Sequence, residues 1–217
     1  MSFVISSVLA FPNISWWCKV LEVQKVCFDV AEHFEKMTYR NRFYIATASG
    51  VHKLSLPVEG GREHKQVMDE VGISYRENWQ KQHWRTLYSA YNNTPYFEHY
   101  APALEKLYQT RFGKLVEFNM AGTLWLKEQL GLKFEHETLT TYQTQYNDAM
   151  YDLRKMKPGF ENCTICDFPL YYQIFQERTG FIPNLSLLDL LFVEGPFTLK
   201  WLRENCETIL AWSTDKN

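Results

Sequence analysis

The residues best suited to chemistry lie in two short segments. The first is Tyr39-Arg40-Asn41-Arg42, which places two guanidinium groups and an amide next to one another. Guanidinium groups donate paired hydrogen bonds that match phosphate and carboxylate oxygens, so this segment can bind an anionic substrate. The same residues also fit the solvated beginning of a strand, with surface ion pairs that contribute little.

The second segment surrounds His83. Trp79 and His83 are four positions apart, so on a helix the imidazole lies beside the indole, and Trp84 follows directly. Desolvation by an aromatic wall would lower the pKa of His83 and leave the ring neutral and able to accept a proton near pH 7. The sequence therefore predicts His83 as a catalytic general base. The alternative is a histidine at the edge of the core that is hydrogen-bonded to a backbone carbonyl.

A third pattern, Cys163-Thr-Ile-Cys166, stands alone. A structural zinc site needs four ligands, and the chain contains neither a second CxxC nor an HxxxH pair that would complete it. We expect no metal site there, and we expect two buried free thiols instead. The sequence also contains no GxxxxGK[ST], GxGxxG, GxSxG or HExxH motif, so the enzyme classes that those motifs mark have no support.

The elements that position these residues begin with strands. Residues 3–9 and 23–30 have strand character, and residues 14–21 between them have apolar residues at helical spacing, which predicts a β-α-β start. Residues 42–48 and 51–58 alternate and are separated by Ser49-Gly50, which predicts a β-hairpin. A further short strand is predicted at residues 71–75.

Helical spacing dominates from Asn78 onward. Asn78 can cap a first helix, Pro95 can begin a second that runs to Gln109, and residues 115–130 form a third that stops at Gly131. Later, residues 186–189 match a capping box for a helix to Val193, and a last helix is expected over residues 196–205. The predicted fold class is α+β, a mixed sheet with the β-α-β start and the hairpin, covered by a mainly helical C-terminal two-thirds.

Length and composition limit the function classes. The 217 residues are 46% hydrophobic and carry a net charge of -2, so we expect one domain spanning residues 1–217 and no global positive field for nucleic acid. No apolar stretch is long enough to span a bilayer, and no basic residue precedes the apolar run over residues 3–11. We therefore expect a cytoplasmic protein that binds no nucleic acid and has no membrane span.

The order of several motifs resembles the WbqC-like protein family. Residues 11–17 (FPNISWW), 39–42 (YRNR) and 54–58 (LSLPV) are similar to its N-terminal signature. Trp79, His83-Trp84, Tyr91 and residues 95–97 (PYF) resemble its central block, and residues 184–191 resemble its closing block. At the first block the usual Gln-Pro start is replaced by Ser7-Val8-Leu9-Ala10-Phe11-Pro12.

The resemblance implies a transferase of bacterial surface-polysaccharide synthesis that moves a glycyl or other acyl group onto an amino sugar or a related amine. The small-molecule substrate would carry a phosphate or a carboxylate. The resemblance does not identify a cofactor. In this scheme His83 is catalytic, and the substrate-binding residues are Tyr39, Arg40, Asn41, Arg42, Trp79, Trp84 and Tyr96. The alternative is a non-catalytic binding or accessory module that recognises a nucleotide-sugar or a protein partner.

Overall fold

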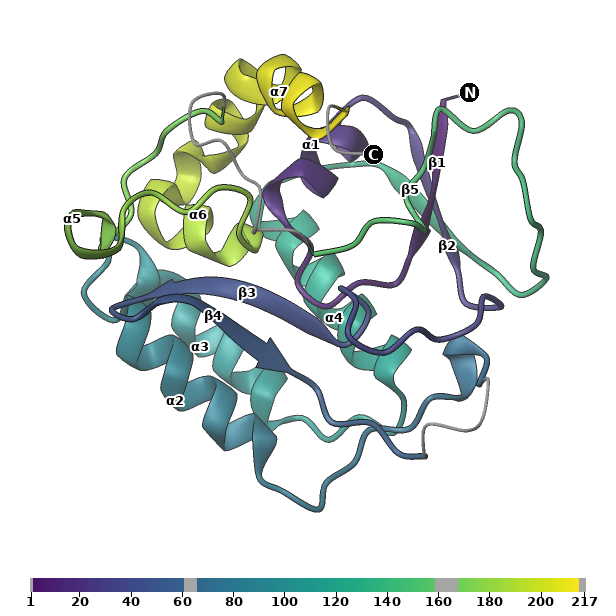
Figure 1. Cartoon of the computed structure of the whole chain (residues 1–217), viewed down its shortest axis with the longest axis horizontal. Helices are drawn as coiled ribbons and strands as arrows, with labels where there is room; N and C mark the ends of the chain where they lie inside the picture. The colour runs from purple at the N-terminus through teal and green to yellow at the C-terminus, as the bar shows by residue number, and fades with distance from the viewer. Residues whose placement is uncertain (1, 61–65, 159–167, 215–217) are drawn as a thin grey trace.

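The computed structural model describes residues 2–60, 66–158 and 168–214 (Figure 1). The strands are β1 (Phe3–Ser7), β2 (Lys25–Asp29), β3 (Arg42–Thr47), β4 (Gly50–Ser55), β5 (Glu135–Leu139) and β6 (Tyr151–Asp152). The helices are α1 (Ile14–Leu21), α2 (Trp79–Tyr91), α3 (Phe97–Gln109), α4 (Leu115–Gln129), α5 (Gln176–Thr179), α6 (Leu187–Glu194) and α7 (Thr198–Thr214), with 3-10 turns η1 (Met68–Glu70) and η3 (Gly195–Phe197). This is the α+β class predicted from the sequence.

The main sheet is parallel throughout and has the order β5-β2-β1-β6. The chain moves outward from β1 through α1 to β2 and later to β5, and then returns to the other side of β1 to form β6. The order in which strands are added therefore reverses beside β1. The predicted β-α-β start is therefore confirmed, and it forms the centre of this sheet.

The hairpin of β3 and β4 is also confirmed, as a separate two-stranded antiparallel sheet. Phe43 and Ile45 alternate into the core, and Gly50 has a φ of 96° at the turn, a conformation that glycine adopts without a steric cost. The prediction of a strand at residues 71–75 is wrong. That segment forms only isolated bridges, from Gly72 to Lys114 and from Ile73 to Val58.

The helices begin and end largely where capping residues predict. The Asn78 side chain accepts a hydrogen bond from the Lys81 amide, and Gly131, with a φ of 64°, follows the end of α4. Two details differ: α3 starts at Phe97 rather than at Pro95, and the last helix extends to Thr214. Asp189 is buried in the core and accepts hydrogen bonds from two tyrosines instead of completing a capping box.

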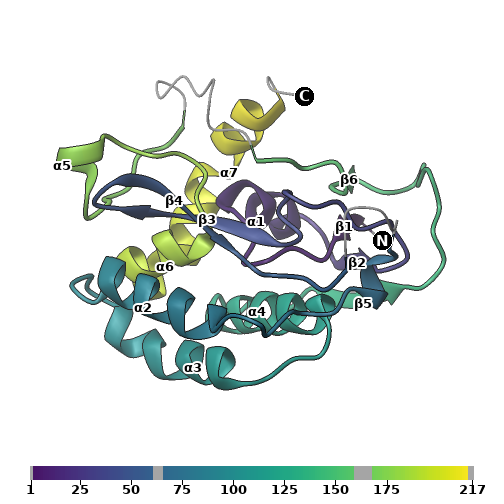
Figure 2. The same cartoon turned by 60° about the horizontal axis from the view of Figure 1, so that its bottom comes forward.

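Two layers of helices enclose the strands. Figure 2 shows α2, α3 and α4 on one side of the molecule and α1 with α7 on the other. A continuous apolar cluster joins both layers and contains the fully buried Phe11, Trp16, Trp17 and Phe118. Within the part of the chain that the structure describes, no helix has the length and apolar character needed to cross a membrane.

Candidate functional site

The carboxyl edge of the parallel sheet gathers polar residues from distant parts of the chain. Ser7, Asp29 and Asp152 are the last residues of β1, β2 and β6, and all three strands point to the same edge. In open sheets of parallel strands, ligands bind outside this edge, at the point where the strand order reverses. Here the strand order reverses at β1, which lies between β2 and β6.

A pocket of about 470 Å³ lies at this edge. We call it the carboxyl-edge pocket. Its lining comes from the segments that follow β2, β5 and β6, and it includes Glu32, Arg40, Tyr142, Thr144, Arg154 and Lys155. Residues from three sequence regions therefore meet where the sheet topology predicts a binding site.

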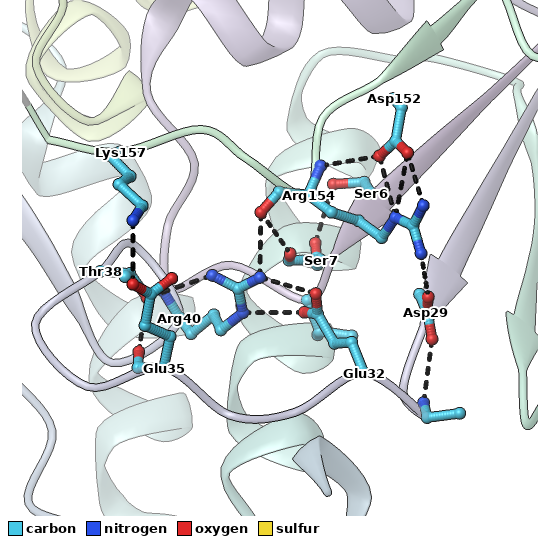
Figure 3. Close-up of polar contacts among 12 residues, drawn as sticks. Ser6, Ser7, Asp29, Glu32, Glu35, Thr38, Arg40, Asp152, Arg154 and Lys157 are labelled. Carbon is cyan, nitrogen blue, oxygen red and sulfur yellow. Dashed lines mark hydrogen bonds and ion pairs between the residues drawn. The ribbon is translucent and has the colours of Figure 1, made fainter. Parts of the chain in front are cut away.

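Arg40 and Glu32 form a buried ion pair on one side of the pocket. The Arg40 Nε and Nη2 atoms donate to the two carboxylate oxygens of Glu32 at 2.8 and 2.6 Å. Nη2 also donates to the backbone oxygen of Arg154 at 2.9 Å (Figure 3). Burial raises the pKa of Glu32, although the bonds from Arg40 act in the opposite direction.

Arg154 is the centre of a second, larger network. Its Nη1 donates to Asp29 at 2.9 Å, and its Nε and Nη2 hold both oxygens of Asp152, the shortest contact being 2.5 Å (Figure 3). Burial alone would raise the pKa of Asp152, but the hydrogen bonds from Arg154 lower it. The guanidinium also donates to the backbone oxygens of Gln143 and Thr144 at 2.7 and 3.3 Å.

The start of α1, which in many such folds binds phosphate, is closed by the chain itself. The Ile14 amide donates to Leu185 O at 3.0 Å, and the Ser15 amide donates to Asn184 Oδ1 at 2.8 Å. The Asn13 side chain accepts from the Trp16 amide at 3.1 Å. Because these donors are satisfied by protein, the start of α1 is not free to bind an anion.

The residues of the predicted segment 39–42 lie in different environments. Arg40 lines the carboxyl-edge pocket. Asn41 instead bridges backbone groups, accepting from the Met37 amide at 3.1 Å and donating to Leu56 O at 3.4 Å. Tyr39 is buried, with its ring edge-on to Tyr44. The direct role in substrate binding predicted for Tyr39 and Asn41 remains a prediction.

Arg42 and His83 lie on opposite faces of the hairpin. Phe43 faces His83, with ring centroids 6.0 Å apart, and adjacent strand residues point to opposite faces, so the Arg42 side chain points away. Arg42 is half-buried, and its buried Nε atom has no hydrogen-bond partner among the described residues. The structure therefore does not bring these two predicted site residues together.

His83 is 5% exposed and lies in an aromatic cluster with Trp79, whose ring centroid is 5.2 Å away. Its Nε2 atom lies 3.1 Å from Ser55 O, so Nε2 carries the proton and Nδ1 is the bare nitrogen. Burial lowers the pKa of His83 to about 4. The ring is not part of the pocket lining, and its catalytic role stays a prediction.

The remaining predicted residues belong to the helical layer. The Trp84 ring stacks on Phe97, and Tyr96 precedes α3 and packs against Gly195. Neither lines the carboxyl-edge pocket. Their contribution to binding is likewise still a prediction.

Sequence reasoning missed Asp29, Glu32 and Arg154. A signal existed for Asp29, because a carboxylate that ends a buried apolar strand marks the binding edge of a parallel sheet. No comparable signal existed for Arg154, which follows a strand of two residues.

Of the five cysteines, Cys18, Cys27 and Cys206 are buried free thiols. Cys163 and Cys166 lie outside the described residues. Within residues 2–60, 66–158 and 168–214, no group of histidine, cysteine and carboxylate side chains is arranged to hold a metal ion.

The fold and the pocket together define an α+β protein with a short parallel sheet and an ion-paired pocket at its carboxyl edge. The chain belongs to the WbqC-like protein family, whose sequence profile matches residues 9–161, more than half of the chain. It is also similar to "Uncharacterized protein Rv1507c" of Mycobacterium tuberculosis, with 25% identity over 201 residues that cover 79% of this chain and 85% of that protein. No solved structure matches significantly.

Proposed function

We propose that the protein is a transferase that attaches a glycyl or other acyl group to the amine of an amino sugar or a related amine, in cytoplasmic steps of bacterial surface-polysaccharide synthesis. The reaction type follows from the family resemblance. The observation that supports a small-molecule substrate is the carboxyl-edge pocket, which combines the expected position in a parallel sheet with charged and aromatic walls.

Two lysines give the pocket its attraction for a phosphate or a carboxylate. Lys155 and Lys157 follow β6, line the pocket and are exposed. Lys157 is 2.9 Å from Glu35, while Lys155 makes no ion pair with another described residue, although its charge lowers the pKa of the nearby Asp152. An exposed lysine that is not held in an ion pair can shift toward a bound oxyanion.

Two other residues of the lining suit a sugar ring. Tyr142 lines the pocket and is 50% exposed, so one side of its ring is free to stack against a ligand. Asp152 also lines the pocket, and its partly exposed carboxylate can accept hydrogen bonds from hydroxyl or amine groups.

Glu32 is the group in this pocket best placed for proton transfer. In the proposed reaction the acceptor amine nitrogen bonds to the acyl carbon of an activated donor, and the bond from that carbon to the leaving group breaks. The amine proton passes to Glu32 and from there to the leaving group. Because burial raises the pKa of Glu32 and Glu32 lines the pocket, it fits this role better than His83, which lies outside the lining.

A second candidate function, a non-catalytic module that recognises a nucleotide-sugar, is favoured by one observation. The N–H groups of Arg40 and Arg154 already bind carboxylates and backbone oxygens. Such saturated guanidinium groups shape a pocket but do not stabilise charge that develops during a reaction. Activity measurements separate the two candidates.

The binding experiment uses titration calorimetry with UDP-glucosamine and with inorganic pyrophosphate. Lys155→Glu reverses a charge in the pocket and should weaken binding of both by about tenfold. The matched control is Lys200→Glu on α7, an exposed lysine remote from the pocket lining, which should bind as the wild type does. Equal affinities for the two variants would remove the pocket from substrate binding.

The activity experiment supplies an amino sugar and an activated acyl donor and measures amide formation. Glu32→Gln retains the hydrogen-bonding shape but cannot take a proton, so the rate should fall by about a hundredfold. His83→Gln is the comparison. A large loss with His83→Gln and none with Glu32→Gln would transfer the general-base role to His83, and binding without amide formation would favour the non-catalytic module.

A further inference from the structure

The wall of the pocket formed by residues 141–148 is attached to the rest of the protein in an unusual way. We call this segment, which lies between β5 and β6, the arm. Every arm residue is exposed except Tyr146, which is half-buried. The arm therefore lacks the apolar anchoring that fixes most loops to a core.

The polar contacts of the arm converge on Arg154. Apart from a local turn bond from the Ala149 amide to Tyr146 O, the hydrogen bonds of the arm within the described chain are those that Arg154 donates to Gln143 O and Thr144 O. The arm's aromatic rings meet the same guanidinium, whose carbon lies 5.4 Å from the Tyr142 centroid and 5.0 Å from the Tyr146 centroid.

Arg154 itself is fixed firmly. Asp29, whose side chain is fully buried, and Asp152 together bind all three guanidinium nitrogens, so the position of Arg154 is set by the sheet and not by the arm. Figure 3 shows Arg154 reaching from the end of β6 to Asp29 at the end of β2. One rigid side chain of the body thus holds an otherwise loosely attached segment.

We propose that the arm is a movable wall of the carboxyl-edge pocket and that Arg154 is the latch that holds it closed. Release of the Gln143 and Thr144 carbonyls frees Tyr142 and Thr144, both of which line the pocket, and opens the pocket to solvent. Reclosure returns the Tyr142 ring to the pocket and traps the ligand. Arg154 is a positioning residue in this scheme, and Lys155 and Lys157 contact the anion.

This inference rests on the proposed function only for the identity of the ligand, because the latch can be measured without one. Limited digestion of the native protein with chymotrypsin, followed by mass spectrometry, reports opening of the arm through cleavage after Tyr142 and Tyr146. Arg154→Lys keeps a positive charge near Asp29 and Asp152, but its ammonium cannot reproduce the planar guanidinium that binds two carbonyls and lies over two rings. Cleavage in the arm should then be about tenfold faster than in the wild type.

Two further variants make the result specific. Lys157→Ala changes the same pocket without touching the arm and should leave arm cleavage at the wild-type rate. Tyr146→Ala keeps every ion pair of Arg154 but removes one stacked ring, so cleavage after Tyr142 should rise severalfold. This variant tests the latch even where Arg154→Lys folds poorly.

The latch is refuted if Tyr146→Ala leaves cleavage after Tyr142 unchanged, or if cuts in Arg154→Lys are spread along the chain with no preference for the arm. A different result would test the proposed function and leave the latch standing. Rapid arm cleavage in Arg154→Lys, together with no binding of UDP-glucosamine or pyrophosphate by the wild type, would support the latch and contradict the proposed substrate class.

Discussion

We expect low pH to destabilise this protein through protonation of His83. A residue at position 83 that does not titrate should remove this effect. The folded-state pKa of His83 is lowered from 6.5 to about 4 because burial disfavours the charged ring. A base whose pKa is depressed on folding contributes its full stability above the unfolded value of 6.5, and that contribution is lost as the pH falls toward 4.

The size of the effect follows from the shift. At about 1.36 kcal/mol for each pKa unit, the full loss amounts to about 3 kcal/mol, and about 2 kcal/mol of it is already lost at pH 5. Because the side chain is 5% exposed, solvent screening reduces this value little.

The assay is urea unfolding of the wild type and His83→Gln at pH 7.5 and pH 5. Glutamine retains a donor for Ser55 O but does not titrate, so the variant should lose about 2 kcal/mol less than the wild type between the two pH values. His99→Gln, at an exposed position on α3, is the matched control and should retain the wild-type difference. Identical pH dependence of the wild type and His83→Gln would refute the assignment of a neutral, buried imidazole.

Two more predictions concern stability. Gly195 has a φ of 53° and a side chain there would overlap the Tyr96 ring, so Gly195→Ala should lower the free energy of unfolding by more than 2 kcal/mol. Gly131→Ala, with a φ of 64° and no atoms nearby, should cost about 1 kcal/mol, and similar losses for the two would contradict the overlap. Arg40→Met strands the buried Glu32 carboxylate and should cost about 3 kcal/mol or more in chemical unfolding, whereas Arg40→Met combined with Glu32→Leu should regain most of it. A double variant no more stable than Arg40→Met would show that the uncompensated charge is not the cause.

Local patterns were enough to predict the first strands, the hairpin and the main helices. Alternation at Phe43 and Ile45 and the cap at Asn78 are properties of neighbouring residues, so they can be recognised without knowledge of the fold. β5 gave no such signal because its first four residues are exposed on both faces of an edge strand. β6 has only two residues, too few to show any period.

The site could be predicted only in part, because local patterns identify single residues and not their distant partners. Arg40 was expected to bind a ligand and does line the pocket, but its partner Glu32 was not recognised. Arg154 and Asp29 are 125 positions apart, and their contact exists only because β6 and β2 lie on either side of β1. Hydrophobic periodicity shows which face of a helix or strand is buried. It does not show which distant element packs beside it.

The closure of the start of α1 by residues 184–187 has a consequence for how the chain folds during synthesis. Ile14 donates to Leu185 O, the Leu187 amide donates to Pro12 O, and Ser186 Oγ donates to Phe11 O across 175 positions. A nascent chain that has emerged only through β6 cannot form these bonds, so its first helix stays incompletely capped until residues 184–187 have been synthesised. Contacts of such long sequence separation also slow folding. Ribosome-bound chains that end before residue 184 should therefore expose this region to proteases and chaperones.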